Sequence, residues 1–338
     1  MARIGQNPLK WIEIGVKPNR ITIATIVYIP ELTGFWKNSL EVLKLCFKSL
    51  YANTSQSFDL MVLDNGSCEE VKQFLLDYQK INKIQFLTFS NYNIRKLGGM
   101  NYLFGSAPGE IVSFVDSDVY FMEGWLDATL EILKIFPRSG MISAIPTVDK
   151  SKDYYDATFD GVELENDIII VQGDNIISDN YVNAHCSSIG KNRLQYIRNI
   201  ENRMDTKITR DGISAYVCAQ DFQFTTTRKV INQVFPFEKT TKENYYDPIY
   251  SPVFESEINK KGFWRLSTEK YLIHHIGNNL ENLDYELSLI DNTLSTNNVL
   301  KEKLDPKYSI KERVRLNRYI RNILKFLYSK LYNLLYRN

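Results

Sequence analysis

The stretch Glu110-Ile-Val-Ser-Phe-Val-Asp-Ser-Asp-Val119 decides the fold. Residues 111–115 form an almost unbroken apolar run, long enough for one buried β-strand and too short for a helix. The run ends abruptly in Asp116-Ser117-Asp118. In open α/β sheets the ligand crevice lies at the carboxyl ends of the strands. The acidic tripeptide is therefore predicted to lie at a binding site.

The two carboxylates of Asp116 and Asp118 repel each other unless a cation lies between them. Oxygen ligands suit Mg²⁺ or Mn²⁺, and such an ion commonly bridges protein carboxylates to the phosphates of a substrate. The alternative is an Asx-type turn that closes a strand and opens a helix. The other motifs of the chain favour the first interpretation, a metal–diphosphate site.

The segments around this stretch alternate between strand and helix patterns. Strands are predicted at 21–28, 58–63, 84–89, 111–115 and 141–145. Helices are predicted at 35–51, from about residue 69, shortly after a loop at 91–101, and at 125–136. Such alternation predicts an α/β fold with a doubly wound, Rossmann-like, mostly parallel sheet flanked by helices.

The alternation breaks down beyond Thr147. Residues 149–211 are polar and rich in Asn and Asp, and one short strand is predicted there, at 168–171. Farther on, the patterns predict a single strand at 215–227, helices at 228–234 and 251–261, and short strands at 263–266 and 271–275. We expect one domain over 1–290, with a nucleotide-binding half at about 20–147 and an acceptor half at about 148–290.

Residues 291–338 are predicted to form a basic amphipathic helical tail. Residues 307–338 contain nine Lys or Arg and one acid, a net charge of +8, although the whole chain carries only +1. One stripe of apolar residues follows spacings of three and four, broken only by Asn317: Ile310, Val314, Ile320, Leu324, Leu327, Leu331 and Leu334. An anionic membrane surface is one predicted partner. The alternative is a helix packed on the main domain or on a second copy.

Composition excludes several classes of protein. The hydrophobic content of 44% and charged content of 24% are ordinary for a soluble globular protein. Confinement of the positive charge to the tail argues against nucleic-acid binding. The four cysteines form no Cys-x-x-Cys pair, and no apolar signal core or membrane-spanning run is found. We therefore expect a cytoplasmic protein, peripheral at the inner face of the membrane if the tail binds lipid.

The order of the motifs resembles that of the family 2 glycosyltransferases, which have the nucleotide-diphosphosugar (GT-A) fold. The resemblance covers residues 21–278. After an apolar first strand, its parts are Val62-Leu-Asp-Asn-Gly-Ser67, Gly98-Gly-Met-Asn101, Asp116-Ser-Asp118, Arg228-Lys-Val230 with Phe235-Pro-Phe237, Lys261-Gly-Phe-Trp-Arg265, and Tyr271-Leu-Ile-His-His-Ile-Gly-Asn278.

The resemblance implies a metal-dependent, inverting enzyme of the hexosyltransferase type (EC 2.4), with Mn²⁺ or Mg²⁺ as cofactor. Such an enzyme moves a sugar from a nucleotide-diphosphosugar, with a UDP-sugar as the first expectation, to an acceptor hydroxyl. The acceptor would be a glycan or a lipid-linked molecule, and the setting surface polysaccharide or glycoconjugate synthesis.

The same resemblance assigns expected roles to donor-binding residues. Asp64 would contact the base or ribose, although it could simply cap a helix. Arg95 and Lys96 would lie near the phosphates, where cations offset developing negative charge, although exposed basic residues are usually only solvated.

Three residues are expected at the metal. Asp116 would lie near the ribose or sugar and the ion, and Asp118 would be the principal ligand. His275 would complete the metal shell or touch the diphosphate; its choice over His274 rests on the family spacing, and a packed histidine is the alternative.

The general base is not identified by the resemblance. Family members usually supply it from a Glu-Asp pair some ten residues before the glycine matched by Gly262, where this chain has Tyr250 and Ser251. The candidates of equal standing are Asp221, Asp247 and Glu255. If none of them lines the sugar site, a different mechanism or a weakened enzyme follows.

Two other function classes remain as alternatives. A carbohydrate-binding or scaffolding protein could have kept the fold and lost the base. A sugar-phosphate nucleotidyltransferase would be expected to carry Arg and Lys in a glycine-rich loop after the first strand, and Tyr28-Ile-Pro-Glu-Leu-Thr-Gly34 has no such pair.

Overall fold

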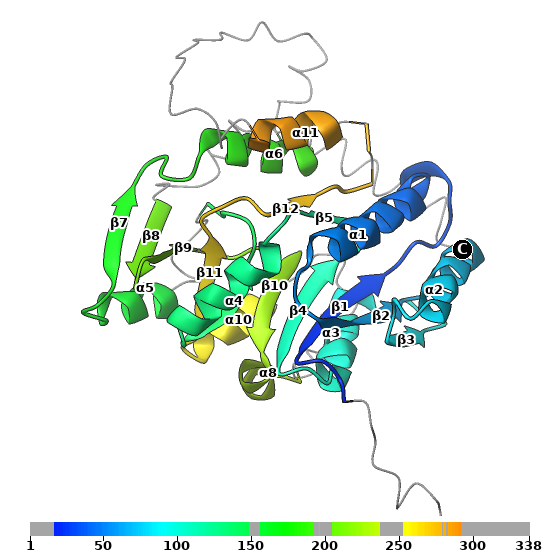
Figure 1. Cartoon of the computed structure of the whole chain (residues 1–338), viewed down its shortest axis with the longest axis horizontal. Coiled ribbons are helices and arrows are strands. Elements are labelled where there is room, and N and C mark those ends of the chain that lie inside the picture. Colours follow the sequence, from blue (N-terminus) through cyan, green and yellow to red (C-terminus); the bar gives the residue numbers. More distant parts are fainter. Residues whose placement is uncertain are drawn as a thin grey trace, which may run out of the picture. The chain divides into compact units, whose positions relative to one another are not determined.

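A computed structural model describes residues 17–148, 156–191, 196, 205–236, 253–278, 280–281 and 283–291 (Figure 1). Asp247 and residues 307–338 lie outside the described residues, so the predictions for this acid and for the tail remain predictions. The domain boundary predicted at 290 also remains a prediction. Within the described part of the chain, no helix is both long and apolar enough to cross a bilayer.

A ten-stranded sheet forms the centre of the fold, in the order β3-β2-β1-β4-β10-β6-β11-β9-β8-β7. Its strands are β1 (Ile21–Val27), β2 (Phe58–Asp64), β3 (Phe86–Phe89), β4 (Ile111–Asp116), β6 (Ser139–Ser143), β7 (Ile169–Gly173), β8 (Asp205–Arg210), β9 (Ile213–Val217), β10 (Gln223–Thr227) and β11 (Trp264–Thr268).

Strands β3, β2, β1, β4, β6 and β11 run in one direction, and β10 is inserted antiparallel between β4 and β6. Beyond β11 the strands β9, β8 and β7 pair antiparallel. The predicted α/β fold with a mostly parallel sheet flanked by helices is confirmed, and it has an antiparallel extension at one edge.

Helices cover both faces of the parallel strands. Helices α1 (Ser39–Asn53) and α2 (Glu69–Lys80) bury their apolar sides in one cluster with Ile23 of β1. Helices α3 (Arg95–Ser106), α8 (Arg228–Val234) and α10 (Val253–Lys260) share a second cluster with the next residue, Ala24. Successive side chains of a strand point to opposite faces. Coverage of both faces therefore explains the continuous apolar runs that the sequence shows.

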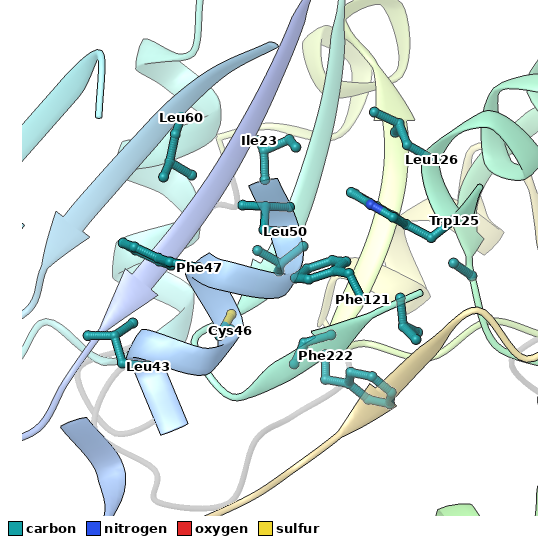
Figure 2. Close-up of a cluster of buried hydrophobic side chains, with 14 of the residues drawn as sticks. Ile23, Leu43, Cys46, Phe47, Leu50, Leu60, Phe121, Trp125, Leu126 and Phe222 are labelled. Atoms are coloured by element: carbon teal, nitrogen blue, oxygen red, sulfur yellow. The ribbon is translucent and has the colours of Figure 1, made fainter. Parts of the chain in front are cut away.

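The first cluster includes the face of α1 that points to the sheet. Figure 2 shows Leu43, Phe47 and Leu50 of this helix near Ile23 and Leu60 of the first two strands. Their spacing of three and four residues places them on one side of the helix. Helix α4 (Trp125–Ile135) contributes to the same cluster through its first turn.

Replacing Phe47 by Ala is expected to destabilise the fold by about 3–5 kcal/mol, because the ring is 1% exposed and the helix can only partly close the cavity. Phe35, which is 66% exposed, is the matched control, and its replacement by Ala should change stability by less than about 0.5 kcal/mol. Urea unfolding of both variants measures the difference. Equal destabilisation by the two variants would contradict this packing.

The structure corrects three sequence-based boundaries. The predicted loop at 91–101 is helical from Arg95 onward, in α3. The stretch 149–211, predicted as irregular apart from one strand, contains helices α5 (Asp156–Glu163) and α6 (Asp179–Ser188), and strand β8 lies across its end. Polar faces of helices at the surface hide the apolar period on which such predictions depend.

The third correction concerns the strand predicted at 215–227, which is two strands, β9 and β10. Between them, the backbone N–H of Cys218 donates to the carbonyl of Arg265, and that of Gln220 donates to the hydroxyl of Ser143. The chain leaves the sheet after β9, which lies beside β11, and re-enters it as β10, between β4 and β6. A continuous run of residues that favour strands does not show this break.

Candidate functional site

The acidic tripeptide lies where the sequence predicts, at the carboxyl end of β4. Asp116 is the last residue of that strand, and Ser117 and Asp118 turn the chain into β5 (Val119–Phe121). The backbone N–H of Asp116 donates to the carbonyl of Phe222 at 2.7 Å, which anchors the strand end. The carboxylate of Asp116 contacts Lys96, and the carboxylate of Asp118 contacts His275. These two contacts define two sides of the site.

On the first side, Lys96 lies between two carboxylates. Its Nζ is 2.9 Å from Oδ2 of Asp116 and 3.4 Å from Oδ2 of Asp221. Lys96 is in the first turn of α3, which packs unusually close to β1: a Cβ on Gly99 would lie 2.6 Å from Cδ1 of Ile26. The glycine therefore allows the helix start, with its lysine, to approach the carboxyl ends of the strands.

Glu255 belongs to the same electrostatic group. It lies in the first turn of α10, is 5% exposed and interacts electrostatically with Arg265, Asp221 and Lys96. Burial raises the pKa of its carboxyl group, and the charge of Arg265 opposes that rise. The structure thus brings together two of the three base candidates, Asp221 and Glu255.

Burial also raises the pKa of Asp116, to about 6. Lys96 opposes this rise, and the neighbouring charges of Asp118 and Asp221 add to it. A cluster of carboxylates with perturbed pKa values is typical of functional sites, where charge is held for a ligand rather than for stability.

On the second side, Asp118 faces His275. Nε2 of His275 lies 3.3 Å from Oδ2 of Asp118, and the backbone N–H of Ile276 donates to the carbonyl of Asp118 at 2.7 Å. His275 ends strand β12 (Ile273–His275), which pairs antiparallel with β5 and places His275 opposite Val119. Burial lowers the pKa of His275, but the carboxylate of Asp118 outweighs this effect, and the net shift is upward.

These two side chains fit a metal ion in part. Oδ1 of Asp118 and Nδ1 of His275 are buried and have no hydrogen-bond partner within the described ranges. Yet no group of three or more His, Cys, Asp or Glu side chains that could hold an ion is found among the described residues. One carboxylate and one imidazole suit an ion that takes its remaining ligands from substrate phosphates and water.

A cavity of about 620 Å³ opens beside Asp118 and His275. Its wall comes from the segment after β1, the start of α1, the end of α6 and the segment after β12. The lining residues include Tyr28, Phe35, Trp36, Ser39, Ser117, Asp118, Ser187 to Gly190, His275 to Asn278 and Glu286. Hydroxyl groups and aromatic rings next to a carboxylate–imidazole pair provide a polar pocket with apolar walls, as small-molecule sites do.

The structure also describes the other two predicted donor-binding residues, Asp64 and Arg95. Asp64 is fully buried at the end of β2, and both of its carboxylate oxygens accept from the backbone N–H of Ser67, at 3.2 and 3.4 Å. Arg95 is exposed at the start of α3 and adopts a positive φ of 64°. The roles of both residues at the nucleotide remain predictions.

Sequence reasoning missed a buried polar chain behind His275. Tyr271, His274, Glu286 and Ser187 are joined by hydrogen bonds of 3.0, 2.8 and 2.6 Å in that order. Glu286 lies in helix α11 (Leu283–Asp291), for which no motif was noted. The sequence signal that could have indicated these hydrogen bonds is the adjacent pair of histidines. His275 faces Asp118, and His274 bonds to Tyr271 and Glu286.

The pH dependence of stability should report Glu286. Burial raises the pKa of its carboxyl group, but hydrogen bonds from His274 and Ser187 outweigh this, and the net pKa lies below 4.5. A carboxyl group whose pKa is lower in the folded state stabilises the fold at pH values above its unfolded-state pKa. This stabilisation is lost as the pH falls through the folded-state pKa. The difference in unfolding free energy between wild type and Glu286→Gln should therefore be constant above about pH 5 and shrink in more acid solution. Urea unfolding across this range measures it; a constant difference down to about pH 3 would contradict the assignment.

Comparison with known proteins gives one match to a family. The family described as "Glycosyl transferase family 2" matches residues 36–216, more than half of the chain. This range contains Asp64, Lys96, Asp116 and Asp118 and ends before Asp221. No curated protein matches the chain.

Several solved structures are similar to parts of the chain. S. aureus TarS 1–349 in complex with UDP-GlcNAc is 20% identical, with 38% of this chain and 35% of that chain covered and a TM-score of 0.31. The mannosyltransferase PcManGT from Pyrobaculum calidifontis, in complex with GDP-Man and Mn²⁺, is 18% identical, with coverages of 41% and 40% and a TM-score of 0.32.

GalNAc-T7 with UDP, GalNAc and Mn²⁺ is 12% identical, with coverages of 88% and 48% and a TM-score of 0.47. In all three comparisons this chain spans less than half of the other protein's chain.

Proposed function

The chain belongs to glycosyl transferase family 2, and on that premise we propose that it transfers a sugar from a nucleotide-diphosphosugar to an acceptor hydroxyl with the help of Mn²⁺ or Mg²⁺. The observation that carries the proposal is the Asp118–His275 pair, which has unsatisfied buried atoms and lines a cavity beside the strand ends. A UDP-sugar is the first donor to test.

Asp118 and His275 would hold the metal ion in this proposal. When bound, the ion supplies Lewis-acid stabilisation of the negative charge on the leaving nucleotide diphosphate. Lys96, paired with Asp116 and Asp221, would add a fixed positive charge on the other side of the tripeptide. In this arrangement the diphosphate of the donor would lie at the metal ion held by Asp118 and His275, and the sugar would lie toward Lys96.

Glu255 is the base that we propose for an inverting transfer. A general base works best when its pKa is close to the operating pH, and burial shifts the pKa of Glu255 upward in that direction. Asp221 forms an ion pair with Lys96, so its carboxylate faces a fixed cation. In this proposal Glu255 removes the proton of the acceptor hydroxyl, and Asp221 holds Lys96 in place.

Thermal unfolding with nucleotide sugars tests the proposal. We expect a UDP-sugar such as UDP-GlcNAc, or else GDP-Man, to raise the Tm with Mn²⁺ and not with EDTA, because a ligand that binds the folded state stabilises it. Slow release of the nucleotide diphosphate should accompany binding. Pyrophosphate release from a nucleoside triphosphate would instead indicate a nucleotidyltransferase, and glycan binding without either reaction would indicate a binding protein.

A glycan or lipid-linked acceptor at a membrane surface is the partner that we propose for the acceptor side. The basic segment 307–338 would hold the enzyme at anionic lipid. Deletion of 307–338 should then abolish binding to vesicles containing phosphatidylserine without changing donor binding. Unchanged vesicle binding would assign the segment to protein contacts.

A further inference from the structure

The carboxylate of Glu286 is buried in a place where it must be fully paired. Its side chain is 7% exposed, Oε1 accepts from the hydroxyl of Ser187 at 2.6 Å, and Oε2 lies 2.8 Å from Nε2 of His274. A buried polar cluster is often no more stable than apolar residues of the same volume. Stability alone therefore does not account for a carboxylate at this position, and its neighbours suggest a function.

The hydrogen bonds form a chain with a fixed direction when His274 is neutral. A carboxylate only accepts, so Nε2 of His274 must donate to Glu286. Nδ1 of His274 then accepts from the hydroxyl of Tyr271, 3.0 Å away. Every polar atom of His274 has a partner, and the plane of its ring is fixed at both ends.

His274 and His275 are consecutive residues of β12, and consecutive side chains of a strand point in opposite directions. The three-residue strand cannot rotate to release one ring without moving the other. Its pairing with β5 and the contact between Ile276 and Asp118 set its register. Anchoring of His274 by Glu286 therefore fixes the direction in which His275 faces Asp118.

The anchor and the ligand pair lie at the same cavity. Glu286 and Ser187 line it together with Asp118 and His275. Each oxygen of Glu286 accepts one hydrogen bond, from Ser187 or from His274, and these two bonds orient the carboxylate toward the histidine strand. Its place is behind the histidine strand, where it can hold the strand in position.

We propose that Glu286 is a positioning residue that acts through His274 to hold His275 against Asp118 for binding of a divalent cation and a diphosphate. This inference rests on the proposed function. Residues that orient metal ligands through hydrogen bonds commonly change metal affinity by about 10–100-fold when they are removed. The same range is expected here.

Calorimetric titration of the full chain with Mn²⁺, in the presence of UDP or GDP, tests the proposal. Glu286→Leu should weaken Mn²⁺ binding about 10-fold or more, whereas Glu286→Gln, which can still make both hydrogen bonds, should weaken it about threefold or less. Tyr271→Phe removes one hydroxyl at the far end of the chain and should also weaken binding while leaving the fold in place. In turnover, the loss should appear in KM for the donor more than in kcat.

Leu287→Ala is the control for a purely structural effect, because Leu287 is half-buried on the same helix and packs in the apolar clusters. It should lower the Tm and leave Mn²⁺ affinity unchanged. Equal affinity in wild type and Glu286→Leu, or equal losses in Glu286→Leu and Leu287→Ala, would overturn the inference. If wild type binds no Mn²⁺ with either nucleotide, the proposed function fails first. If His275→Ala weakens binding but Glu286→Leu does not, only the positioning role fails.

Discussion

Replacing Asp118 by Asn is expected to abolish metal-dependent donor binding and to reduce sugar transfer by at least about 10²–10³-fold. Asn has the shape of Asp but lacks the charge that a hard cation requires. The side chain also faces His275 at 3.3 Å, so the substitution removes the negative charge that faces both the proposed ion and the imidazole. Calorimetry with Mn²⁺ and nucleotide measures binding, and release of the nucleotide diphosphate measures turnover.

The fold should survive this change. The strand end is anchored by backbone hydrogen bonds, including that from Ile276 to the carbonyl of Asp118, which Asn preserves. Asp284→Asn, at an exposed position on α11, is the matched control and should leave binding and turnover unchanged. Normal metal-dependent turnover in Asp118→Asn would remove the basis of the proposed function.

Replacing Glu255 by Gln is expected to lower kcat by about 10²–10⁴-fold and to leave the KM for the donor almost unchanged. The amide cannot accept the proton of the acceptor hydroxyl, but it fills the same buried space. Steady-state kinetics with donor and acceptor separate the two constants. The pH profile provides a second measurement, because the acid limb of kcat/KM should disappear together with the carboxyl group.

Asp221→Asn distinguishes the two base candidates that the structure brings together. If Glu255 is the base, loss of the Asp221 charge should alter donor KM through Lys96, whose Nζ is 3.4 Å from Oδ2 of Asp221. A loss of kcat in Asp221→Asn with normal kcat in Glu255→Gln would reverse the assignment. Normal kcat in both variants would direct attention to Asp247.

The sequence predicted the parallel part of the fold well because its strands are covered on both faces. The run from Ile111 to Val115 is buried throughout, so its apolar character is continuous and easily read. In the stretch 149–211 the strand predicted at 168–171 is present as β7, but helices α5 and α6 and strand β8 were not predicted, because polar residues interrupt the apolar spacing in each of them. The local sequence pattern predicts secondary structure less well where the core covers only one face of an element.

The position of the acidic tripeptide followed from the rule that ligands bind at strand ends, and the structure places it there. The ion pairs of Lys96 could not be predicted, since they depend on how closely α3 approaches β1 at Gly99. Which of the two histidines faces Asp118 depends on the register of β12 against β5. The partner of His274, Glu286, belongs to a helix that shows no motif.

The pairing of β5 with β12 has a consequence for how the protein is made. Asp118 borders the first of these short strands, and His275 ends the second, far later in the chain. While translation proceeds from the amino terminus, strands β1 to β4 can pair with one another long before His275 emerges from the ribosome. Affinity for the proposed ion would therefore arise only after His275 has been synthesised, and the nascent chain would have no ligand-dependent stability from this site before then.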